Sequence, residues 1–462
     1  MASGRVRRAL DPVAAPVHDP LVAIEELRQR VASALGSLVD PRGAALNSPA
    51  LTPPLYDAYE QFVSGQDVYW RGDWEASLPH FRRAVALDTS FHSALAFVGV
   101  VGVGTGRCEL TDSVARELTR RGDRVPELDR ITAQISQARC ASDHAEHNRL
   151  QRRRAALMPG SKLVQLTMST GFRQLNLAAE AQAILGNIDP ARDLGWIPER
   201  GRAFYWREVT ATQHALGDYR AERATAARMA AMGGSRLAVG YFAARSLAAL
   251  GHIDSVHGIL TSIADAPIDP AILSGIIGGR LNPVALATPG WVMYQVALEL
   301  AARGHEHASA RAVRRSIAWF EQRGPVERLP VEQRFVLAQA LVAARRLDDA
   351  RTLLTALVAL DTSMIEFRGA LGVVAAQEGD RTAAREVDEW LAARRGGHPP
   401  GAPALFRAEI AAITGDTAAA MEIIESLPRG AHPYDWLQFH IDPAFAELRK
   451  SERFHRFLVP KG

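Results

Sequence analysis

The sequence is short of several kinds of residue, and each shortage excludes a class of protein. Only two of the 462 residues are cysteines, which are too few for a disulfide framework, and nothing in the composition indicates an oxidising compartment. No segment approaches 18 consecutive apolar residues, and no apolar run of signal-peptide length follows the first arginines. We therefore expect a soluble, cytoplasmic protein with no membrane partner.

Lysine is also scarce, and aromatic residues make up only 7% of the chain. Three lysines stand against 51 arginines, and the formal net charge is +3. The arginines are spread through every segment and alternate with Asp and Glu, as they do on solvated helix faces. Because no basic patch is indicated, we do not expect a nucleic-acid partner.

A turn signal repeats along the chain. Gly72 and Gly106 are 34 residues apart, and so are Gly217 and Gly251. Glycine can adopt the left-handed conformation that ends a helix, so each step predicts a tight turn between two paired helices. The turns are expected at Gly72-Asp73, Gly217-Asp218, Gly251-His252, Gly304-His305, Gly379-Asp380 and Gly415-Asp416, and at Arg346-Leu347, where the glycine is lost.

Other glycines mark the places where paired helices should touch. Gly65, Gly99 and Gly372 each lie seven residues before such a turn or its equivalent. A larger side chain there would push the two helices apart. The second helix of the first pair shows the expected apolar period, with Leu78 and Phe81 at a spacing of three residues.

From Leu55 to about Leu427 the chain resembles the tetratricopeptide repeat (TPR) superfamily, with roughly nine or ten helix pairs. The match is best in the pair around Gly72, and Trp206 with Gly217 matches it in a middle pair. The resemblance implies an all-α fold, a right-handed superhelical solenoid of antiparallel helix pairs. In such folds the inner groove, lined by the first helices, binds an extended peptide or a partner helix.

A narrower likeness lies at the two ends of the array. The segments Asp19-Pro20-Leu21, Asp40-Pro41-Arg42, Pro53-Pro54-Leu55 and Asp442-Pro443-Ala444-Phe445 resemble the C-terminal TPR region of bacterial multidomain regulators. In those regulators a Ser/Thr kinase, cyclase or TolB-like domain precedes the repeats, and no such domain stands before Leu55 here. Residues 1–18 have room for no more than a remnant of such a domain. The likeness implies a role in bacterial signalling or regulation.

We expect four segments. Residues 1–54 form a tail, one amphipathic helix and a linker, and the helix must dock on something to bury its apolar stripe. Residues 55–265 form a first sub-array, residues 266–290, rich in proline and glycine, form a loop or hinge, and residues 291–462 form a second sub-array with a C-terminal cap. The stripe consists of Leu21, Ile24, Leu27, Val31, Leu35 and Leu38.

Three patterns could carry chemistry, and none is complete. Cys140, His144 and His147 could face one side of a helix and offer zinc ligands, but no fourth ligand follows at a standard spacing. The glycine run at 99–106 lacks the preceding strand and the lysine of a phosphate-binding loop. His305-Glu306-His307 lacks the spacing of a zinc protease motif. We therefore expect no enzymatic activity, no cofactor and no metal.

The sequence thus favours a non-enzymatic protein- or peptide-binding scaffold. A ligand-sensing module derived from a kinase or transcriptional regulator is the alternative, and an enzyme or metal protein that uses the Cys140 region comes third. Aromatic and arginine side chains are good anchors for peptide groups and carboxylates. Alignment of the pairs predicts that the groove is lined by Tyr59, Phe62, Gln66, Tyr69, Phe204, Arg207, His214, Tyr241 and Arg245.

Overall fold

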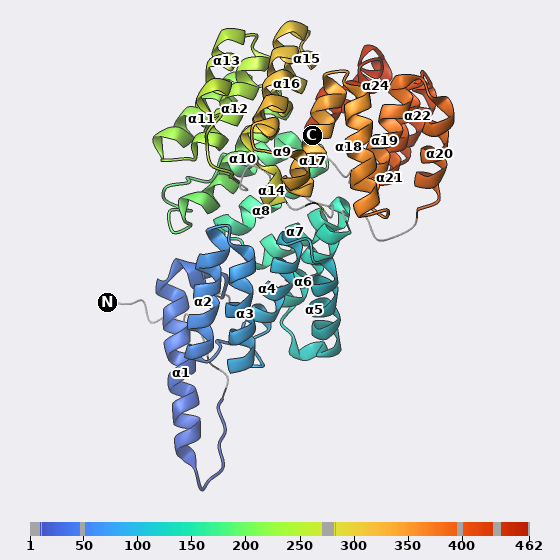
Figure 1. Cartoon of the computed structure of the whole chain (residues 1–462). Coiled ribbons are helices and arrows are strands. Elements are labelled where there is room, and N and C mark those ends of the chain that lie inside the picture. The colour runs from blue at the N-terminus through green and yellow to red at the C-terminus, as the bar shows by residue number, and fades with distance from the viewer. Residues whose placement is uncertain are drawn as a thin grey trace. The chain divides into compact units, whose positions relative to one another are not determined.

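The computed structural model of the chain is all-α (Figure 1) and describes residues 10, 12–46, 51–141, 143–269, 281, 283–394, 401–427 and 436–460. These residues divide into two compact units. Unit 1 takes its described residues from 1–140, 146–165 and 189–202, and unit 2 takes them from 141–145, 166–188 and 203–462. Within the described part of the chain, no helix combines the length and the apolar character needed to cross a membrane.

The helices follow one another in antiparallel pairs. In chain order they are α1 (Pro20–Val39), α2 (Tyr56–Trp70), α3 (Trp74–Leu87), α4 (His92–Gly104), α5 (Cys108–Arg120), α6 (Glu127–Cys140), α7 (His144–Leu157), α8 (Lys162–Gln174), α9 (Ala178–Leu185), α10 (Glu199–Ala215), α11 (Tyr219–Ala231), α12 (Arg236–Ala249), α13 (Ile253–Ser262), α14 (Pro283–Leu286), α15 (Pro289–Ala302), α16 (Glu306–Glu321), α17 (Val331–Ala343), α18 (Leu347–Leu360), α19 (Ile365–Glu378), α20 (Arg381–Ala392), α21 (Ala402–Ile413), α22 (Thr417–Ser426), α23 (Trp436–Ile441) and α24 (Glu452–Leu458). Short 3-10 helices lie at Pro41–Leu46 (η1), Gly122–Arg124 (η2), Val326–Arg328 (η4), Pro443–Phe445 (η5) and Leu448–Lys450 (η6).

The predicted turns between paired helices are confirmed. Gly72 has a φ of 86° and ends α2, and the next residue, Asp73, caps α3 by accepting a hydrogen bond from the backbone of Ala76. The glycines at 217, 251, 304, 379 and 415 also have positive φ. Where the glycine is lost, Arg345 takes the left-handed conformation, one residue before the predicted step. The fold class is therefore the predicted all-α array of TPR-like helix pairs.

The predicted close contacts between paired helices are also present. A Cβ atom on Gly65 would lie 2.8 Å from Cε1 of Phe81, and one on Gly372 would lie 2.7 Å from Cγ1 of Val387. At Gly99 the corresponding contact, to Val114, would be 3.3 Å. The glycine run after Gly99 is therefore part of helix α4 and its turn, and its small residues serve packing.

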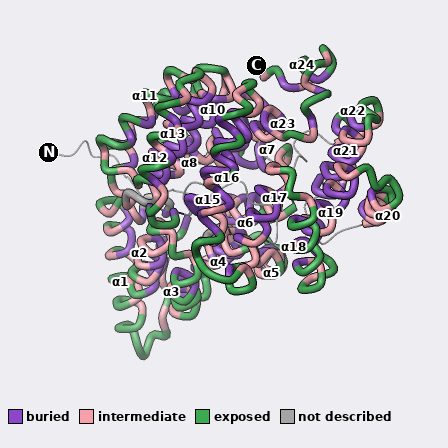
Figure 2. The backbone as a smooth tube through the Cα atoms, turned by 45° about the horizontal axis from the view of Figure 1, so that its top comes forward, coloured by how far each residue is buried: buried purple, intermediate pink, exposed green. Residues whose placement is uncertain are grey.

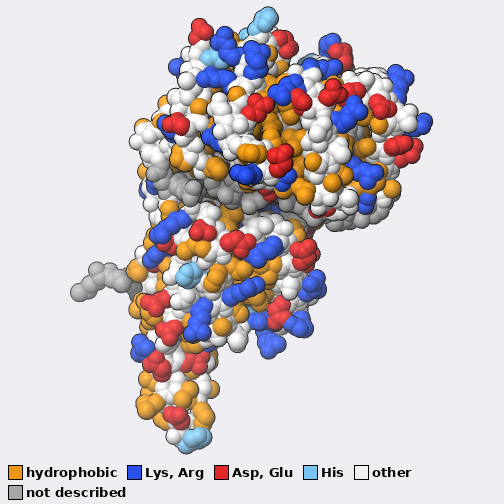
Figure 3. Space-filling view, in the orientation of Figure 1, with side chains coloured by type: hydrophobic (Ala, Val, Ile, Leu, Met, Phe, Trp, Pro, Cys, Tyr) orange, Lys and Arg blue, Asp and Glu red, His pale blue; other side chains and the backbone are white. Residues whose placement is uncertain are grey.

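Helix α1 docks by a different face from the one predicted. Its buried residues are Ser33, Ala34 and Ser37, and the ring of Tyr59 on α2 lies against Gly36. The apolar stripe stays largely exposed (Figure 2), and Figure 3 shows hydrophobic side chains along this helix. Leu21, for example, is 69% exposed. Small residues let the two helices approach closely, so they form the contact that the larger stripe residues would prevent.

The two cysteines are paired, contrary to the sequence-based expectation. Cys108, the first residue of α5, is bonded to Cys140, the last residue of α6, with 5.7 Å between their Cα atoms. The periodicity within each helix does not reveal this pairing, because the pairing depends on how α5 packs against α6. Cys140 is therefore not a free thiol that could bind a metal. In the described ranges no group of three His, Cys, Asp or Glu side chains is arranged around a possible metal ion.

The division between the units does not fall at residues 266–290. Helices α12 and α15, on either side of that stretch, pack together, and the indole of Trp319 donates a hydrogen bond to the carbonyl of Ala264. Residues 270–280 and 282 of the predicted hinge lie outside the described residues. At the C-terminal end, Phe445 and Phe454 pack in one apolar cluster with Ile424 of the last pair.

Candidate functional site

Unit 2 contains a cavity of about 580 Å³ on the face formed by its first helices. Helices α15, α17, α19 and α21 supply its walls, and the C-terminal segment, residues 436–450, borders it. On α21 the lining residues are Ala402, Phe406, Glu409 and Ile413, spaced by three or four residues. This spacing places them on one face of the helix, so the repeated helix pairs present successive stripes to the same space.

The C-terminal segment is held on this unit by several hydrogen bonds. The indole of Trp436 donates to the carbonyl of Gln174 at 2.9 Å. The amide of Asn176 donates to the carbonyls of Leu458 and Val459. Gln438 donates to the side chain of Gln295 on α15 at 3.1 Å. The chain's own polypeptide therefore occupies part of this surface.

One end of the cavity is polar. The carboxyl groups of Glu409 and Asp442 are hydrogen-bonded to each other. Asp442 also accepts a hydrogen bond from the backbone of Ala444 at 2.8 Å, and Arg449 donates to the carbonyl of Asp442 at 2.7 Å. The rest of the lining includes apolar groups such as Trp291 and Phe406. The lining also includes Glu306, Arg345 and Glu366, so the cavity combines apolar groups with several charged ones; we call the Glu409–Asp442 pair with Arg449 its polar end.

The carboxyl pair holds a proton. Burial raises the pKa of Glu409 well above its usual range, and the neighbouring Asp442 raises it further. Burial also raises the pKa of Asp442, although the Ala444 amide and Arg449 oppose this effect. Because two adjacent carboxylates repel each other, the protonated form of Glu409 is favoured, while Arg449 favours the charged form of Asp442.

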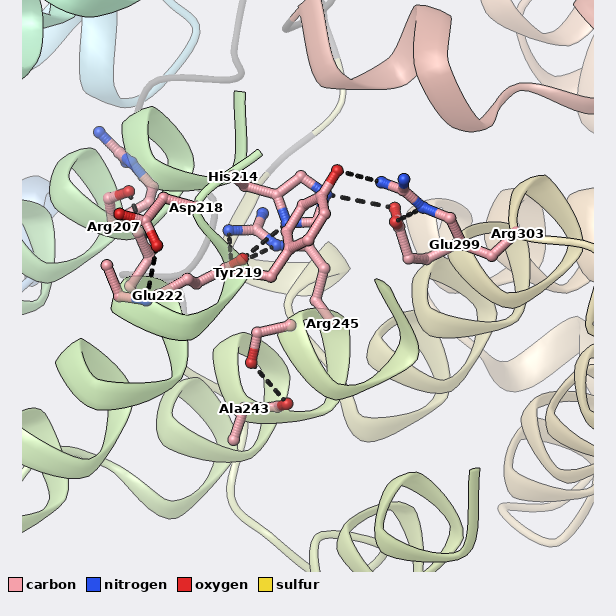
Figure 4. Close-up of polar contacts among 12 residues, drawn as sticks. Arg207, His214, Asp218, Tyr219, Glu222, Ala243, Arg245, Glu299 and Arg303 are labelled. Atoms are coloured by element: carbon pink, nitrogen blue, oxygen red, sulfur yellow. Dashed lines mark hydrogen bonds and ion pairs between the residues drawn. The ribbon is translucent and has the colours of Figure 1, made fainter. Parts of the chain in front are cut away.

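Unit 2 also contains a buried ion network, which involves helices α10, α11, α12 and α15. Nδ1 of His214 lies 2.6 Å from Oε2 of Glu222, and Nε2 lies 3.4 Å from Oε2 of Glu299. Arg245 binds Glu222 from the other side, with Nε at 2.8 Å. Arg303 contacts Oε1 of Glu299 at 2.8 Å (Figure 4). These charges join α10, α11, α12 and α15.

The pKa shifts in this network favour its charged form. Burial opposes ionisation of Glu299, but His214 and Arg303 hold its pKa at about 2. Burial also opposes protonation of His214, but Glu222 and Glu299 raise its pKa overall. Burial and the charge of His214 lower the pKa of the neighbouring His440 to about 4. Both nitrogens of His214 face carboxylates, so this histidine serves as a buried cation.

A second buried ion network contains Arg207, another residue of the predicted groove. Arg207 and Arg173 both bind the carboxylate of Glu208, at 2.5 Å and 2.9 Å. Burial opposes ionisation of Glu208, but the two arginines hold its pKa at about 2. Replacement of one partner in such a group would leave a buried charge without compensation.

The predicted groove residues of unit 1 lie in helix contacts. Phe62 is fully buried between the rings of Phe81, Phe91 and Phe97, and Tyr59 is 4% exposed. The remaining two are Gln66, which accepts a hydrogen bond from Trp70, and Tyr69, which packs edge to face with the same indole. Their side chains fill the interior of unit 1, and their predicted binding role stays a prediction.

The predicted groove residues of unit 2 lie in or beside the two buried ion networks, the one around His214 and the one around Glu208. Arg207, His214 and Arg245 are at most 7% exposed. Phe204 lies under the guanidinium of Arg207, and Tyr241 lies under that of Arg245. Their positions in the first helices were predicted from the repeat, but their partners Glu222 and Glu299 were not. Those carboxylates belong to other helices, α11 and α15, so the periodicity within α10 does not indicate that they lie beside His214.

Sequence reasoning also missed the cavity residues Glu409, Asp442 and Arg449. A usable signal was present in α21, where Ala402, Phe406, Glu409 and Ile413 share a helical face and Glu409 interrupts apolar neighbours. The contribution of Asp442 and Arg449 depends on where the C-terminal segment lies, which the repeat spacing does not show.

Comparison with known proteins places the chain in no family. No protein-family model matches it, and no curated protein matches it significantly. Solved structures that resemble it include a human IFIT1 dimer with PPP-AAAA, at 11% identity and a TM-score of 0.35 over 87% of this chain and 93% of that one. The Cut9–Hcn1 hetero-tetramer of the APC/C has 12% identity and a TM-score of 0.28, over 88% and 85%. Naa15/Naa10 bound to HypK-THB has 12% identity and 0.27, over 86% and 69%. At these values the similarity supports no inference about what the chain binds.

Proposed function

We propose that the chain is a non-enzymatic scaffold that binds a protein or peptide segment on the first-helix face of unit 2. The observation that carries this proposal is the placement of the C-terminal segment, which lies on unit 2 beside the open cavity. A face that holds one polypeptide segment through side-chain and backbone hydrogen bonds has the chemistry to hold another. A role in bacterial signalling or regulation remains part of the proposal.

The test is whether this face binds a polypeptide that is not covalently attached. A protease site inserted between Leu427 and Trp436 would allow the C-terminal segment to be cut from the folded protein. A fluorescent synthetic peptide of residues 436–460 should then exchange with the cut segment. Its dissociation constant should lie in the micromolar range, which corresponds to a binding free energy of about −8 kcal/mol. A scrambled peptide of the same composition is the control. Equal binding of the two peptides would refute the proposal.

A ligand-sensing module is the second candidate, and one observation favours it. The cavity volume of about 580 Å³ falls within the range of roughly 300–1,000 Å³ that small-molecule pockets occupy. The two candidates share the same face and differ in what fills it. Thermal stabilisation by a small molecule, without a bound polypeptide, would favour the second.

The cellular compartment is a further part of the proposal. The composition predicts a cytoplasmic protein, but the bond between Cys108 and Cys140 is of the kind that persists in oxidising compartments. The observation that decides between them is the redox state of the two cysteines in protein isolated under alkylating conditions. Alkylated thiols would support the cytoplasmic prediction.

A further inference from the structure

We propose that the cavity of unit 2 binds an organic cation, an ammonium group on an apolar body, with Glu409 and Asp442 receiving the charge. The inference rests on the proposed function, because it assumes that this face of unit 2 holds a ligand, and it specifies the chemistry of that ligand. It stands on three features of the cavity: the charges at its polar end, the groups along its walls, and its volume.

The polar end has one more carboxyl group than it has cations. Glu409 is 6% exposed and its nearest charged neighbour is Asp442. Arg449 is the cation at this end, and it interacts with Asp442 and also with Glu299. Among the described residues, no cation contributes to the shift in the pKa of Glu409, and the raised pKa favours its uncharged, protonated form. An ammonium group that entered the cavity would take the place of that proton.

The remaining charges of the lining argue against an anion. Four carboxyl groups and two guanidinium groups line the cavity in total. Arg345 donates a hydrogen bond to Gln377 at 2.9 Å, so it already has an acceptor. Arg449 is engaged by Asp442. An anionic ligand would therefore face a carboxyl majority and compete for guanidinium groups that are in use.

The walls fit an apolar or aromatic body. Trp291, Phe335 and Phe406 line the cavity from three different first helices. Aromatic faces attract ammonium groups as well as apolar surface. A volume of about 580 Å³ accommodates a small amine or the side chain and neighbouring residues of a lysine-containing peptide.

Exchange of the proton for a cation makes binding depend on pH. When the ammonium group binds, Glu409 ionises and one proton leaves to solvent, so affinity should rise with pH while Glu409 is protonated in the empty cavity. The groups that interact with Glu409 are Asp442 of the C-terminal segment and Tyr294 of α15, and Arg449 acts on Asp442. Glu299 and His440 interact electrostatically with Arg449.

The experiment is isothermal titration calorimetry on the full chain with matched probes. The free amine 2-phenylethylamine is compared with the neutral 2-phenylethanol and the anionic phenylacetate. A second arm compares acetyl-Phe-Lys-amide with acetyl-Phe-Gln-amide, so that a small-molecule amine can be told from a lysine side chain. Each cationic probe is titrated in two buffers of different ionisation enthalpy, which reports the number of protons released.

We expect at least one cationic probe to bind at least tenfold more tightly than its neutral partner, with release of about one proton. Glu409→Gln should lower that affinity roughly tenfold or more while retaining the fold, because Gln resembles the protonated carboxyl group. Glu386→Gln, the same change at an exposed residue of α20 outside the cavity lining, should alter it less than about threefold.

The outcomes separate this inference from the proposed function. Equal binding of cationic and neutral probes, or unchanged binding by the Glu409→Gln variant, would overturn the cation site and leave polypeptide binding intact. Failure of both cationic probes to bind would also overturn it. If the cut protein described above also fails to rebind its own segment selectively, the proposed function falls as well.

Discussion

Nδ1 of His214 lies 2.6 Å from a carboxylate oxygen of Glu222. The two residues belong to the two helices of one pair, α10 and α11, and both are buried. On its other side the imidazole faces Glu299 of α15, from a later pair. A histidine between two carboxylates therefore links helix pairs that are separated in the sequence.

Replacement of this histidine should destabilise unit 2. In His214→Ala, Glu222 keeps Arg245 and Glu299 keeps Arg303, but both lose a cation in a buried setting. Breaking a buried ion group in this way typically costs about 3–5 kcal/mol. Urea unfolding at pH 7 should show a loss of this size, whereas His252→Ala, at an exposed turn position, should cost less than about 1 kcal/mol. Similar losses for the two variants would contradict the assignment.

Asp129 in unit 1 should make stability depend on pH. Burial raises its pKa to about 7, although Ser93 donates a hydrogen bond to it at 2.7 Å and opposes the shift. The folded protein therefore holds a proton that the unfolded chain, with a pKa of about 3.9, releases. This contribution favours the folded state at low pH and is lost as the pH rises from about 4 to 7.

Asp129→Asn should remove this dependence, because the amide carries no charge at any of these pH values. The variant should exceed the parent in free energy of unfolding by about 2–4 kcal/mol at pH 8 and by much less at pH 4. Chemical unfolding of both proteins at the two pH values measures the difference. A constant difference across the range would show that Asp129 does not titrate as described.

The disulfide should stabilise unit 1. It joins residues 32 positions apart, and a loop of that size typically contributes about 2–4 kcal/mol. The double variant Cys108→Ser and Cys140→Ser should lose this amount of unfolding free energy. Reductant should lower the stability of the parent to a similar level and leave the variant unchanged. Equal effects of reductant on both proteins would argue against the bond.

Replacement of glycine by alanine should have opposite effects on stability at Gly65, which is in close contact with another helix, and at Gly258, which is not. Gly65→Ala would place a methyl group against the ring of Phe81, and such overpacking costs about 1–3 kcal/mol. Gly258 lies on the exposed side of α13 with no atom near its Cβ position. Gly258→Ala should therefore stabilise by roughly 0.5–1 kcal/mol through helix propensity alone. Thermal unfolding of the two variants should show shifts of opposite sign.

The sequence predicted the helix pairs because their turns obey local rules. A glycine such as Gly72 takes the left-handed conformation, and the following Asp73 caps the next helix, so both signals lie within a few residues. The same local reasoning identified which helices come first in each pair. It also located His214 and Arg245 within the first helices, although not their burial among charges.

What the sequence did not show depends on contacts between distant segments. The pairing of Cys108 with Cys140 requires the packing of α5 on α6, and the exposed stripe of α1 follows from a docking contact at Gly36. The polar end of the cavity needs Glu409 of α21 beside Asp442 of the C-terminal segment. The sequence pattern identifies each of these residues but does not show which distant residue it contacts in the fold.

Binding of the 436–460 peptide to the intact and to the cut protein tests whether the first-helix face of unit 2 binds a polypeptide segment. The peptide has Phe439 as a buried anchor, 1% exposed in the intact chain. We expect micromolar binding to the cut protein, little binding to the intact protein whose own segment occupies the face, and a loss of at least roughly tenfold in affinity for Phe439→Ala. Identical affinities of the native, Phe439→Ala and scrambled peptides for the cut protein would show that this face does not bind the segment selectively.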